Sequence, residues 1–253
     1  MPRLSRASVT AGLANLVARR TSLLDVELTT LGALVRPGDV CVDVGSAAGL
    51  YCQALSHLVG PTGAVHSVEP VTFSHPFWTR VLGAARRPNV RHHAVALGPD
   101  EGRAAMRVPY DARGPATSRS FLDWHSTGLG SNDEYPRHED VAVDVRTLDG
   151  LCAGLDRVDF VKIDVEGGEL HVLRGGERTV ERFRPTLLVE IEARHTDRYA
   201  YAPADIVAWL AERGYRMYAW RDGWRRTDVV CLHANNYLFR PGTDHSGRRA
   251  DRS

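Results

Sequence analysis

The chain has 253 residues, 43% hydrophobic side chains and a formal net charge of +1. This length fits one large α/β domain, and this share of apolar residues is enough for a sizeable core. A nearly balanced charge gives no overall attraction to nucleic acid or to an anionic membrane. The four cysteines form no C-x-x-C pair, and no apolar run reaches about 18 residues. We therefore expect a cytoplasmic protein without a zinc knuckle and without stable membrane insertion.

Residues 1–38 precede the regular part of the sequence and contain two helical patterns. Between positions 24 and 35, leucine and valine recur at the spacing of one helix face, and Pro37-Gly38 ends that pattern. The first 20 residues are basic, as in transit peptides, but they have no clear apolar segment or cleavage site. An amphipathic helix is the favoured interpretation, so residues 1–38 are expected to form a helical cap.

From residue 40 onwards, short apolar strands alternate with helices. Strands are expected at 40–44, 64–68, 89–95, 158–163, 186–191 and 215–220, and helices at 50–59, 73–86, 169–183 and 203–213. Alternation of this kind predicts an α/β domain over residues 39–240, with a mainly parallel sheet and helices on both faces. A turn at Asp222-Gly223 into a last strand at 229–238 would add an antiparallel hairpin. Residues 241–253 are expected to be a disordered basic tail.

The stretch 109–140 interrupts this alternation. Additional strands are expected on either side of it, at 103–108 and 141–145, and the stretch itself is rich in Gly, Ser, Pro, Asp and Arg. A stretch that long inside a compact domain is usually a functional lid or a disordered insert, and both alternatives stay open. Phe121, Leu122 and Trp124 give it some capacity to fold over a substrate.

The segment VCVDVGSAAGL at 40–50 is the first binding motif. A glycine directly after a strand allows a sharp turn, and a ligand can approach the N–H groups at the start of the next helix. The loop has G-x-x-x-G, with Ala47 where the dinucleotide fingerprint needs a second glycine for a pyrophosphate. A cofactor without pyrophosphate fits better. The methionine part of S-adenosylmethionine has an amino group that suits Asp43 and a carboxylate that suits the loop amides.

Glu69 ends the next strand, 69 − 49 = 20 residues after Gly49. A carboxylate at this point can accept hydrogen bonds from two ribose hydroxyls. The alternative is a solvated acid at a strand end. Taken together with the loop, Glu69 favours a ligand that carries a nucleoside.

The segment DFVKIDVEGGE at 159–169 places acids at the carboxyl end of a further strand, the sheet edge where ligands bind in α/β folds. Asp164 would face this crevice, with Glu166 beside it. Lys162 is the only lysine of the chain. Its side chain is either part of the substrate site or a long side chain that reaches solvent at the edge of the sheet.

Glu190, Glu192 and His195 follow the next strand and lie at the same sheet edge. His195 has the chemistry of a general base near neutral pH, although a solvated loop histidine is the commoner case. Glu190 together with Asp164 is an alternative site for a divalent cation such as Mg²⁺, since hard cations bind carboxylate oxygens. This alternative is the less favoured one, and no metal site is predicted.

DFVKIDVEGGELHVLRGG followed by RPTLLVEIE is similar to the signature of FkbM-type methyltransferases. VCVDVGSAAGLYCQAL and VHSVEP resemble the cofactor segments of that family, and VRTLDGL resembles its motif before the fourth strand. The resemblance covers residues 40–218. The chain departs from it at Ser46-Ala47-Ala48, where Ala-Asn-x is more usual, and in the stretch 109–140.

The resemblance implies a Rossmann-like class I methyltransferase fold with S-adenosylmethionine as cofactor. The implied reaction is O-methylation of a hydroxyl group on a sugar, a glycolipid or a polyketide-type metabolite. The implied cofactor-binding residues are Asp43, Gly45, Ser46 and Gly49 for the methionine end, Glu69 for the ribose, and Ala94 and Val95 near the adenine. We expect Asp164 or His195 to accept the hydroxyl proton, with Glu190 as a further catalytic candidate. Lys162, Glu166 and Glu192 are expected to contact the acceptor.

Three other functions are alternatives to this one. A nucleic-acid aminomethyltransferase is expected to carry an Asn/Asp-Pro-Pro-aromatic turn where this chain has Asp164-Val165-Glu166-Gly167, an acidic edge that repels phosphates. The loop spacing disfavours a nicotinamide-dependent oxidoreductase, and a cofactor-binding protein without catalysis is the third alternative. The expected partner is therefore a small-molecule or glycolipid acceptor and not a nucleic acid, with a homodimer possible.

Overall fold

The computed structural model describes residues 26–71, 87–231 and 234–242. The expected helix at 73–86, most of the expected N-terminal cap and nearly all of the expected basic tail lie outside these residues. No helix within the described ranges is long and apolar enough to cross a membrane.

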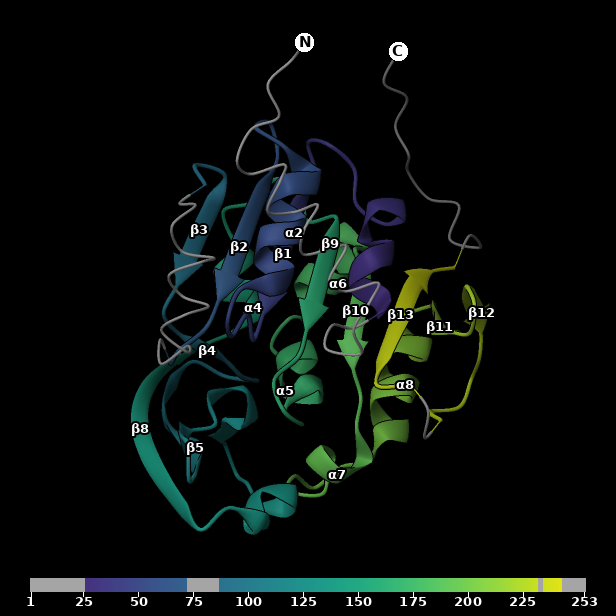
Figure 1. Cartoon of the computed structure of the whole chain (residues 1–253). Coiled ribbons are helices and arrows are strands. Elements are labelled where there is room, and N and C mark those ends of the chain that lie inside the picture. The colour runs from purple at the N-terminus through teal and green to yellow at the C-terminus, as the bar shows by residue number, and fades with distance from the viewer. Residues whose placement is uncertain (1–25, 72–86, 232–233, 243–253) are drawn as a thin grey trace, which may run out of the picture.

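The main sheet has eight strands within the described residues, in the order β12-β11-β13-β10-β9-β1-β2-β3 (Figure 1). These strands are β1 (Val40–Val44), β2 (Ala64–Val68), β3 (Val90–His93), β9 (Phe160–Ile163), β10 (Thr186–Glu190), β11 (Tyr215–Trp220), β12 (Trp224–Arg226) and β13 (Asn236–Pro241). The five strands from β10 to β3 pair in parallel, whereas β13 lies antiparallel between β10 and β11. This order is that of class I methyltransferases, so the predicted Rossmann-like fold is confirmed.

The end of the chain differs from the prediction. The turn at Asp222-Gly223 leads only into the short edge strand β12, which pairs antiparallel with β11. The last strand is only partly as expected at 229–238, because β13 begins at Asn236 and lies inside the sheet. Burial explains the difference: Val229 is 69% exposed, whereas Tyr237, Leu238 and Phe239 are fully buried between the two helical layers.

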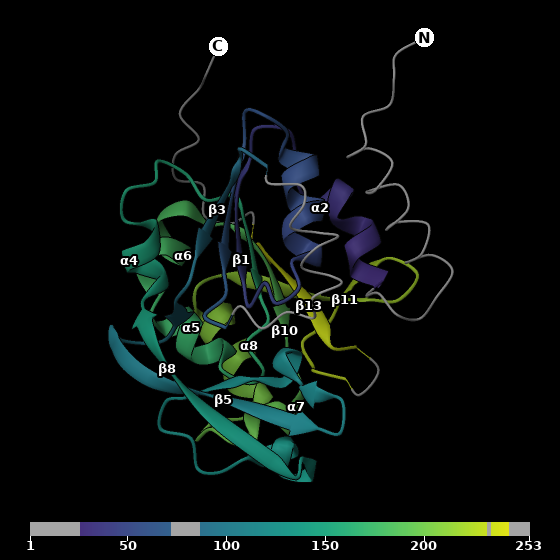
Figure 2. The same cartoon turned by 60° about the vertical axis from the view of Figure 1, so that its left-hand side comes forward.

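Helices cover both faces of the main sheet (Figure 2). Their bounds are η1 (Val26–Ala33), α2 (Leu50–Val59), α4 (Leu148–Cys152), α5 (Glu169–Arg174), α6 (Glu177–Phe183), α7 (Ala193–Thr196) and α8 (Pro203–Glu212). Successive strand side chains point to opposite faces, so Cys41 and Phe160 pack with α2 and η1 while Val42 and Val161 pack with α5 and α6. The single helix expected at 169–183 is interrupted at Gly175-Gly176.

The stretch 109–140 belongs to a second, smaller sheet. Its strands are β4 (Ala96–Leu97), β5 (Gly102–Asp111), β6 (Gly114–Pro115), β7 (Phe121–Asp123) and β8 (Arg137–Arg146), with η2 (Thr117–Arg119) and η3 (Gly130–Glu134) between them. The disordered alternative is therefore wrong. Phe121 is fully buried, and Arg107 donates to Asp123 at 2.9 Å and to Asp140 at 2.8 Å, so the polar composition is used in ion pairs.

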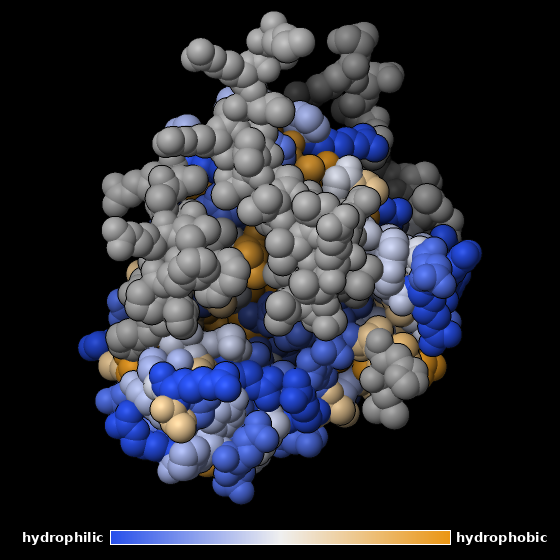
Figure 3. Space-filling model, in the orientation of Figure 1, coloured by the Kyte–Doolittle hydropathy of each residue, from blue (hydrophilic) through white to orange (hydrophobic). Residues whose placement is uncertain are grey.

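The small sheet lies beyond the carboxyl ends of β1, β9 and β10 (Figures 1 and 2). Its outer face is mostly hydrophilic (Figure 3), whereas Met106, Val108 and Val143 form a separate apolar cluster with Leu122 on the inner side. The second sheet thus covers the edge of the main sheet where the predicted site residues gather.

Gly45 allows the loops after β1 and β9 to meet. Its φ is +78°, and a Cβ at this position would lie 1.7 Å from the carbonyl oxygen of Asp164. Gly49 has nearly the same φ, +81°, but a Cβ there would meet no atom of the described chain within 4 Å. The first glycine of the motif is therefore required by close packing between two loops, and the second by backbone conformation alone.

The Gly45→Ala variant should be less stable than Gly49→Ala. Both substitutions place an alanine in the left-handed region, at a cost of roughly 1–2 kcal/mol, but only Gly45→Ala also forces the β1 and β9 loops apart. Urea unfolding of the two variants measures the difference. Equal losses in the free energy of unfolding would show that the contact with Asp164 is relaxed at no cost.

Candidate functional site

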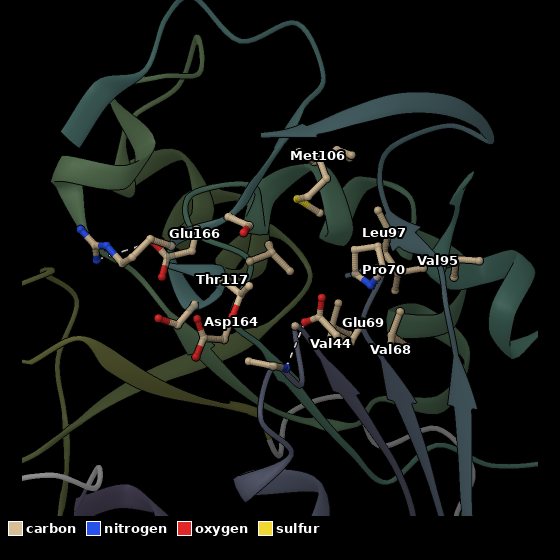
Figure 4. Close-up of a pocket in the computed structure, with 18 of the residues that line it drawn as sticks. Val44, Val68, Glu69, Pro70, Val95, Leu97, Met106, Thr117, Asp164 and Glu166 are labelled. Carbon is tan, nitrogen blue, oxygen red and sulfur yellow. Dashed lines mark hydrogen bonds and ion pairs between the residues drawn. The ribbon is translucent and has the colours of Figure 1, made fainter. Parts of the chain in front are cut away.

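A cavity of about 320 Å³ lies between the ends of the main strands and the small sheet (Figure 4). The loops after β1 and β2 contribute Gly45, Ala47 and Glu69, and the ends of β9 and β10 contribute Asp164, Glu166 and Glu190. The insert 109–140 contributes residues 117–120 and Leu122, while residues 95–97 and Met106 of β5 complete the lining. Its size falls within the roughly 300–1,000 Å³ of small-molecule sites. The structure thus brings together motifs that are far apart in the sequence.

Glu69 connects the two cofactor loops. Its carboxylate accepts hydrogen bonds from the N–H of Ala47 at 3.0 Å and from the N–H of Val71 at 2.9 Å. Burial raises the pKa of Glu69, and these two hydrogen bonds oppose the effect. The side chain is therefore fixed at the wall of the cavity, where it can meet the hydroxyl groups of a ligand.

The loop amides are largely used within the protein. The N–H groups of Gly45 and Ser46 both donate to the carbonyl oxygen of Val68, at 3.0 and 3.1 Å. The Ser46 hydroxyl is buried 2.8 Å from that of Ser67, so it faces the sheet and not the cavity. A ligand carboxylate would therefore need donors other than these two amides.

Asp43 carries a buried carboxylate oxygen, Oδ2, that has no hydrogen-bond partner among the described residues. The N–H of Cys52 in α2 donates to this carboxylate, and burial raises its pKa to about 7 against the charge of Lys162. Buried acceptors are almost always paired, so an orphaned oxygen under the cofactor loop fits a donor supplied by a ligand, directly or through water. Asp43 is only 1% exposed and does not itself line the cavity.

Of the two residues expected near the adenine, Val95 lines the cavity and Ala94 does not. Strand β3 ends at His93, two residues earlier than the predicted strand, and Val95 lines the cavity beside Ala96 and Leu97. Ala94 is exposed and contributes nothing to that lining. Met106 was not predicted, because nothing in the sequence of β5 indicates that this side chain lines the cavity.

Asp164 and Glu190 form a hydrogen-bonded pair at the ends of adjacent strands, and both line the cavity. Burial raises the pKa of Glu190, and the negative charge of Asp164 raises it further. Burial would also raise the pKa of Asp164, but the ammonium of Lys162 and the hydrogen bond from Glu190 hold it below its ordinary value. The pair therefore holds one proton on Glu190 and leaves Asp164 ionised.

Lys162 is 0% exposed and lies in β9, in the middle of the sheet. The idea of a side chain reaching solvent at a sheet edge is therefore wrong. Its Nζ donates to Oδ1 of Asn236 at 2.9 Å and to Oδ2 of Asp164 at 3.3 Å. Lys162 is not among the side chains of the cavity wall, so it reaches the site through Asp164.

His195 is 2% exposed and lies behind the cavity wall. Its Nε2 is 3.0 Å from Nη1 of Arg119 and 3.3 Å from a carboxylate oxygen of Glu166, two residues that do line the cavity. Burial lowers the pKa of His195 to about 4; Arg119 lowers it further, whereas Glu192 opposes the shift. The neutral imidazole accepts from Arg119, so its position suits an anchor of the insert better than a base.

Glu192 was expected in the site and lies outside it, whereas Arg119 was not expected and lines the cavity. Glu192 accepts from Asn235 at 2.6 Å and from Arg194, and it lies outside the cavity lining of the described chain. Arg119 was not predicted, because it lies in the insert, which matched no known motif. It contacts both His195 and Glu166, and no sequence signal links these three positions.

A metal ion was considered for this cluster. One ligand atom each from Glu166, Glu190 and His195 lies within 4.8 Å of the others. The Arg119 guanidinium, however, is 3.0 Å from His195 and 3.6 Å from Glu166, so a positive charge already occupies the cluster. Asp164 and Glu190 share a proton in place of a cation. We assign no metal ligand among these side chains.

The Glu166→Gln variant should flatten the pH dependence of stability. Burial, with the charge of Asp164, raises the pKa of Glu166 from 4.5 to about 8. Between these values the folded protein holds a proton that the unfolded chain has released, so the free energy of unfolding falls as pH rises, by at most about 1.4 kcal/mol per pH unit.

The measurement is urea unfolding of both proteins at several values between pH 6.5 and 8, where the titration of histidines is common to both proteins and cancels in the comparison. Wild type should lose more stability across this range than Glu166→Gln. The exposed Glu134→Gln variant is the control and should follow wild type. Parallel curves for wild type and Glu166→Gln would contradict the assigned protonation.

The model of the methyltransferase FkbM domain matches residues 43–217. The chain is 26% identical over 178 residues to the 2-O-methyltransferase NoeI of Sinorhizobium fredii, covering 66% of this chain and 70% of that protein. It is 29% identical over 176 residues to the 31-O-demethyl-FK506 methyltransferase FkbM of Streptomyces tacrolimicus, covering 58% and 62%.

A solved structure of methyltransferase FkbM from Methylobacillus flagellatus aligns with a TM-score of 0.49 and 17% identity, over 94% of this chain and 55% of that one. The chain spans between 57% and 70% of the lengths of the curated relatives that it matches. The domain match includes the β1 loop, Glu69, the insert, the Asp164 segment and the strand that carries Glu190. This match confirms the family predicted from the motifs: the chain belongs to the FkbM methyltransferase family.

Proposed function

We propose that this chain is an S-adenosylmethionine-dependent O-methyltransferase that acts on a hydroxyl group of a sugar, a glycolipid or a polyketide-type metabolite. The observation that carries the proposal is the shared cavity, where the cofactor loops face an ionised Asp164 and a wall from the insert. Two relatives whose names specify an O-linked position support an oxygen acceptor.

In this proposal the cofactor occupies the side of the cavity formed by β1, β2 and the residues after β3. Glu69 accepts hydrogen bonds from the ribose, Asp43 receives the amino group, and Val95 contacts the adenine. Gly45 and Gly49 give the loop its shape. When bound, S-adenosylmethionine supplies a methyl group on a sulfonium, whose sulfur keeps the electron pair of the bond that breaks.

The chain's own residues align the acceptor and take its proton. Alignment of two bound reactants accounts for much of the acceleration, because the methyl donor is already activated. A positioned general base adds typically about 10²–10⁴-fold. Asp164 is the base in this proposal, because it is ionised and lines the cavity, whereas His195 is covered by Arg119 and Glu166. Glu190 and Glu166 shape the acceptor side.

Residues 117–120 form the opposite wall, and we propose that the insert is a lid over the acceptor. Carboxylates outnumber cations in the cavity wall, which favours a neutral acceptor over the phosphates of a nucleic acid. The cytoplasmic location, the homodimer and the helical cap at 1–38 stay predictions.

Calorimetry with S-adenosylmethionine and with NAD tests the cofactor. We expect binding of the first and not of the second. Glu69→Gln should weaken S-adenosylmethionine binding at least tenfold, since a hydrogen bond to a charged group contributes about 1.5–3 kcal/mol. The Glu134→Gln variant should bind like wild type. Tighter binding of NAD, or unchanged affinity in Glu69→Gln, would contradict the proposed site.

Transfer of a labelled methyl group tests the reaction. Incubation with labelled S-adenosylmethionine and extracts of the native host identifies the acceptor. With that acceptor and saturating cofactor, Asp164→Asn should lower kcat by about 10²-fold or more while cofactor affinity is retained. His195→Ala should have a smaller effect. An unchanged kcat in Asp164→Asn would remove this residue from the chemistry.

A further inference from the structure

Lys162 is the only lysine in a chain that has 32 lysines and arginines in total, and it lies fully buried in a central strand. Removing an ammonium from water is costly unless charged and polar partners surround it. Its partners therefore indicate why a buried cation is present at this point of the sheet.

Asn236 anchors the ammonium from one side. Nζ donates to the amide oxygen of Asn236 at 2.9 Å, inside the sheet and away from the cavity. Asn236 is the first residue of β13, the strand that lies antiparallel beside β10. In this pairing Asn236 lies opposite Glu190. Tyr51 of α2 adds its ring face at 5.1 Å. The ammonium thus contacts β13 and α2, and it also donates to Asp164.

The ammonium discriminates between the two carboxylates of the pair. Nζ forms an ion pair with Oδ2 of Asp164 at 3.3 Å, whereas Lys162 acts on Glu190 through its charge, which lowers the pKa of that carboxyl against the larger effect of burial. A cation bonded to one carboxylate stabilises its ionised form, so the proton of the pair stays on Glu190, which donates to Asp164.

Several other charged groups face Asp164. They are Asp43 from β1, Glu69 after β2, Glu166 and Glu169 from the following loop and helix, Glu190 from β10 and His195 from α7. The other carboxylates among them oppose ionisation of Asp164, whereas Glu190 favours it by donating a hydrogen bond. His195 is neutral at pH 7. Lys162 is the cation within hydrogen-bond distance that offsets them in the described structure.

We propose that Lys162 is a positioning residue that holds Asp164 as the carboxylate facing the cavity, so that Asp164 and not Glu190 accepts the acceptor proton. The inference deepens the proposed function and rests on it. In this step the O–H bond of the acceptor breaks, its electron pair stays on the acceptor oxygen, and the proton binds an Asp164 oxygen. Lys162 keeps its charge throughout.

A single lysine makes the contact directly observable. Protein grown with lysine labelled by ¹³C at Cε and ¹⁵N at Nζ gives one side-chain NMR signal, which belongs to Lys162. We expect the signal of a charged ammonium from pH 5 to pH 8, without an inflection that Asp164→Asn removes. Asp164→Asn and Asn236→Leu should both shift this signal, and Glu134→Gln should not.

Lys162→Met tests the consequence for catalysis with the identified acceptor. The acidic limb of its pH profile for kcat should move up by one pH unit or more, which lowers kcat on that limb by about tenfold per pH unit of displacement and leaves kcat at higher pH nearly unchanged. Affinity for S-adenosylmethionine should stay unchanged by calorimetry. A residue that merely supported the fold would lower activity without moving this limb. If Lys162→Met fails to fold, Asn236→Leu provides the same comparison with a smaller shift.

Three results would overturn the assignment. They are the signal of a neutral amine, an inflection between pH 5 and 8 that Asp164→Asn removes, and an acidic limb that does not move. Failure of the proposed function is distinguishable, because wild type would then bind no S-adenosylmethionine whatever the lysine signal shows. Binding of S-adenosylmethionine together with any of the three results would remove only the role of Lys162.

Discussion

The site depends on the crowding of carboxylates where β1, β9 and β10 end. Asp43 is buried, Asp164 and Glu190 are half-buried at the cavity wall beside it, and Glu166 follows in the next loop. Unopposed negative charges this close together would destabilise the fold. Three things offset the repulsion: the ammonium of Lys162, the guanidinium of Arg119 and a proton held between Asp164 and Glu190.

The same charges connect the two sheets. Arg119 of the insert contacts Glu166 and His195. Two residues shortly after His195, Arg198 and Tyr199, also contact the insert. Tyr199 donates to the carbonyl oxygen of Leu122 at 2.6 Å, and the Arg198 guanidinium stacks on Phe121 at 4.0 Å. The insert is therefore fixed over the cavity by the segment that follows β10.

The identity of the elements followed from local patterns in the sequence. The strand at Val40–Val44 and the helix at Leu50–Val59 match the prediction, because apolar periodicity and glycine punctuation act within a few residues. Asp164, Glu69 and Glu190 also gather as expected, since the carboxyl ends of parallel strands share one edge of a sheet. These inferences needed only short-range order and the handedness of parallel connections.

The sequence by itself determined the family, the parallel core and the acids at its edge, because each of these is encoded in contiguous motifs. Only the tertiary structure decided that Arg119 meets His195, that Asn236 anchors Lys162 and that Gly45 must clear the backbone of Asp164. These contacts join positions separated by 74 or more residues in the case of Arg119 and Lys162. Their formation depends on where β13 inserts in the sheet and on how the insert folds back over the cavity. Both are decided by the burial of apolar surfaces that are distant in the sequence, so no local sequence pattern predicts them.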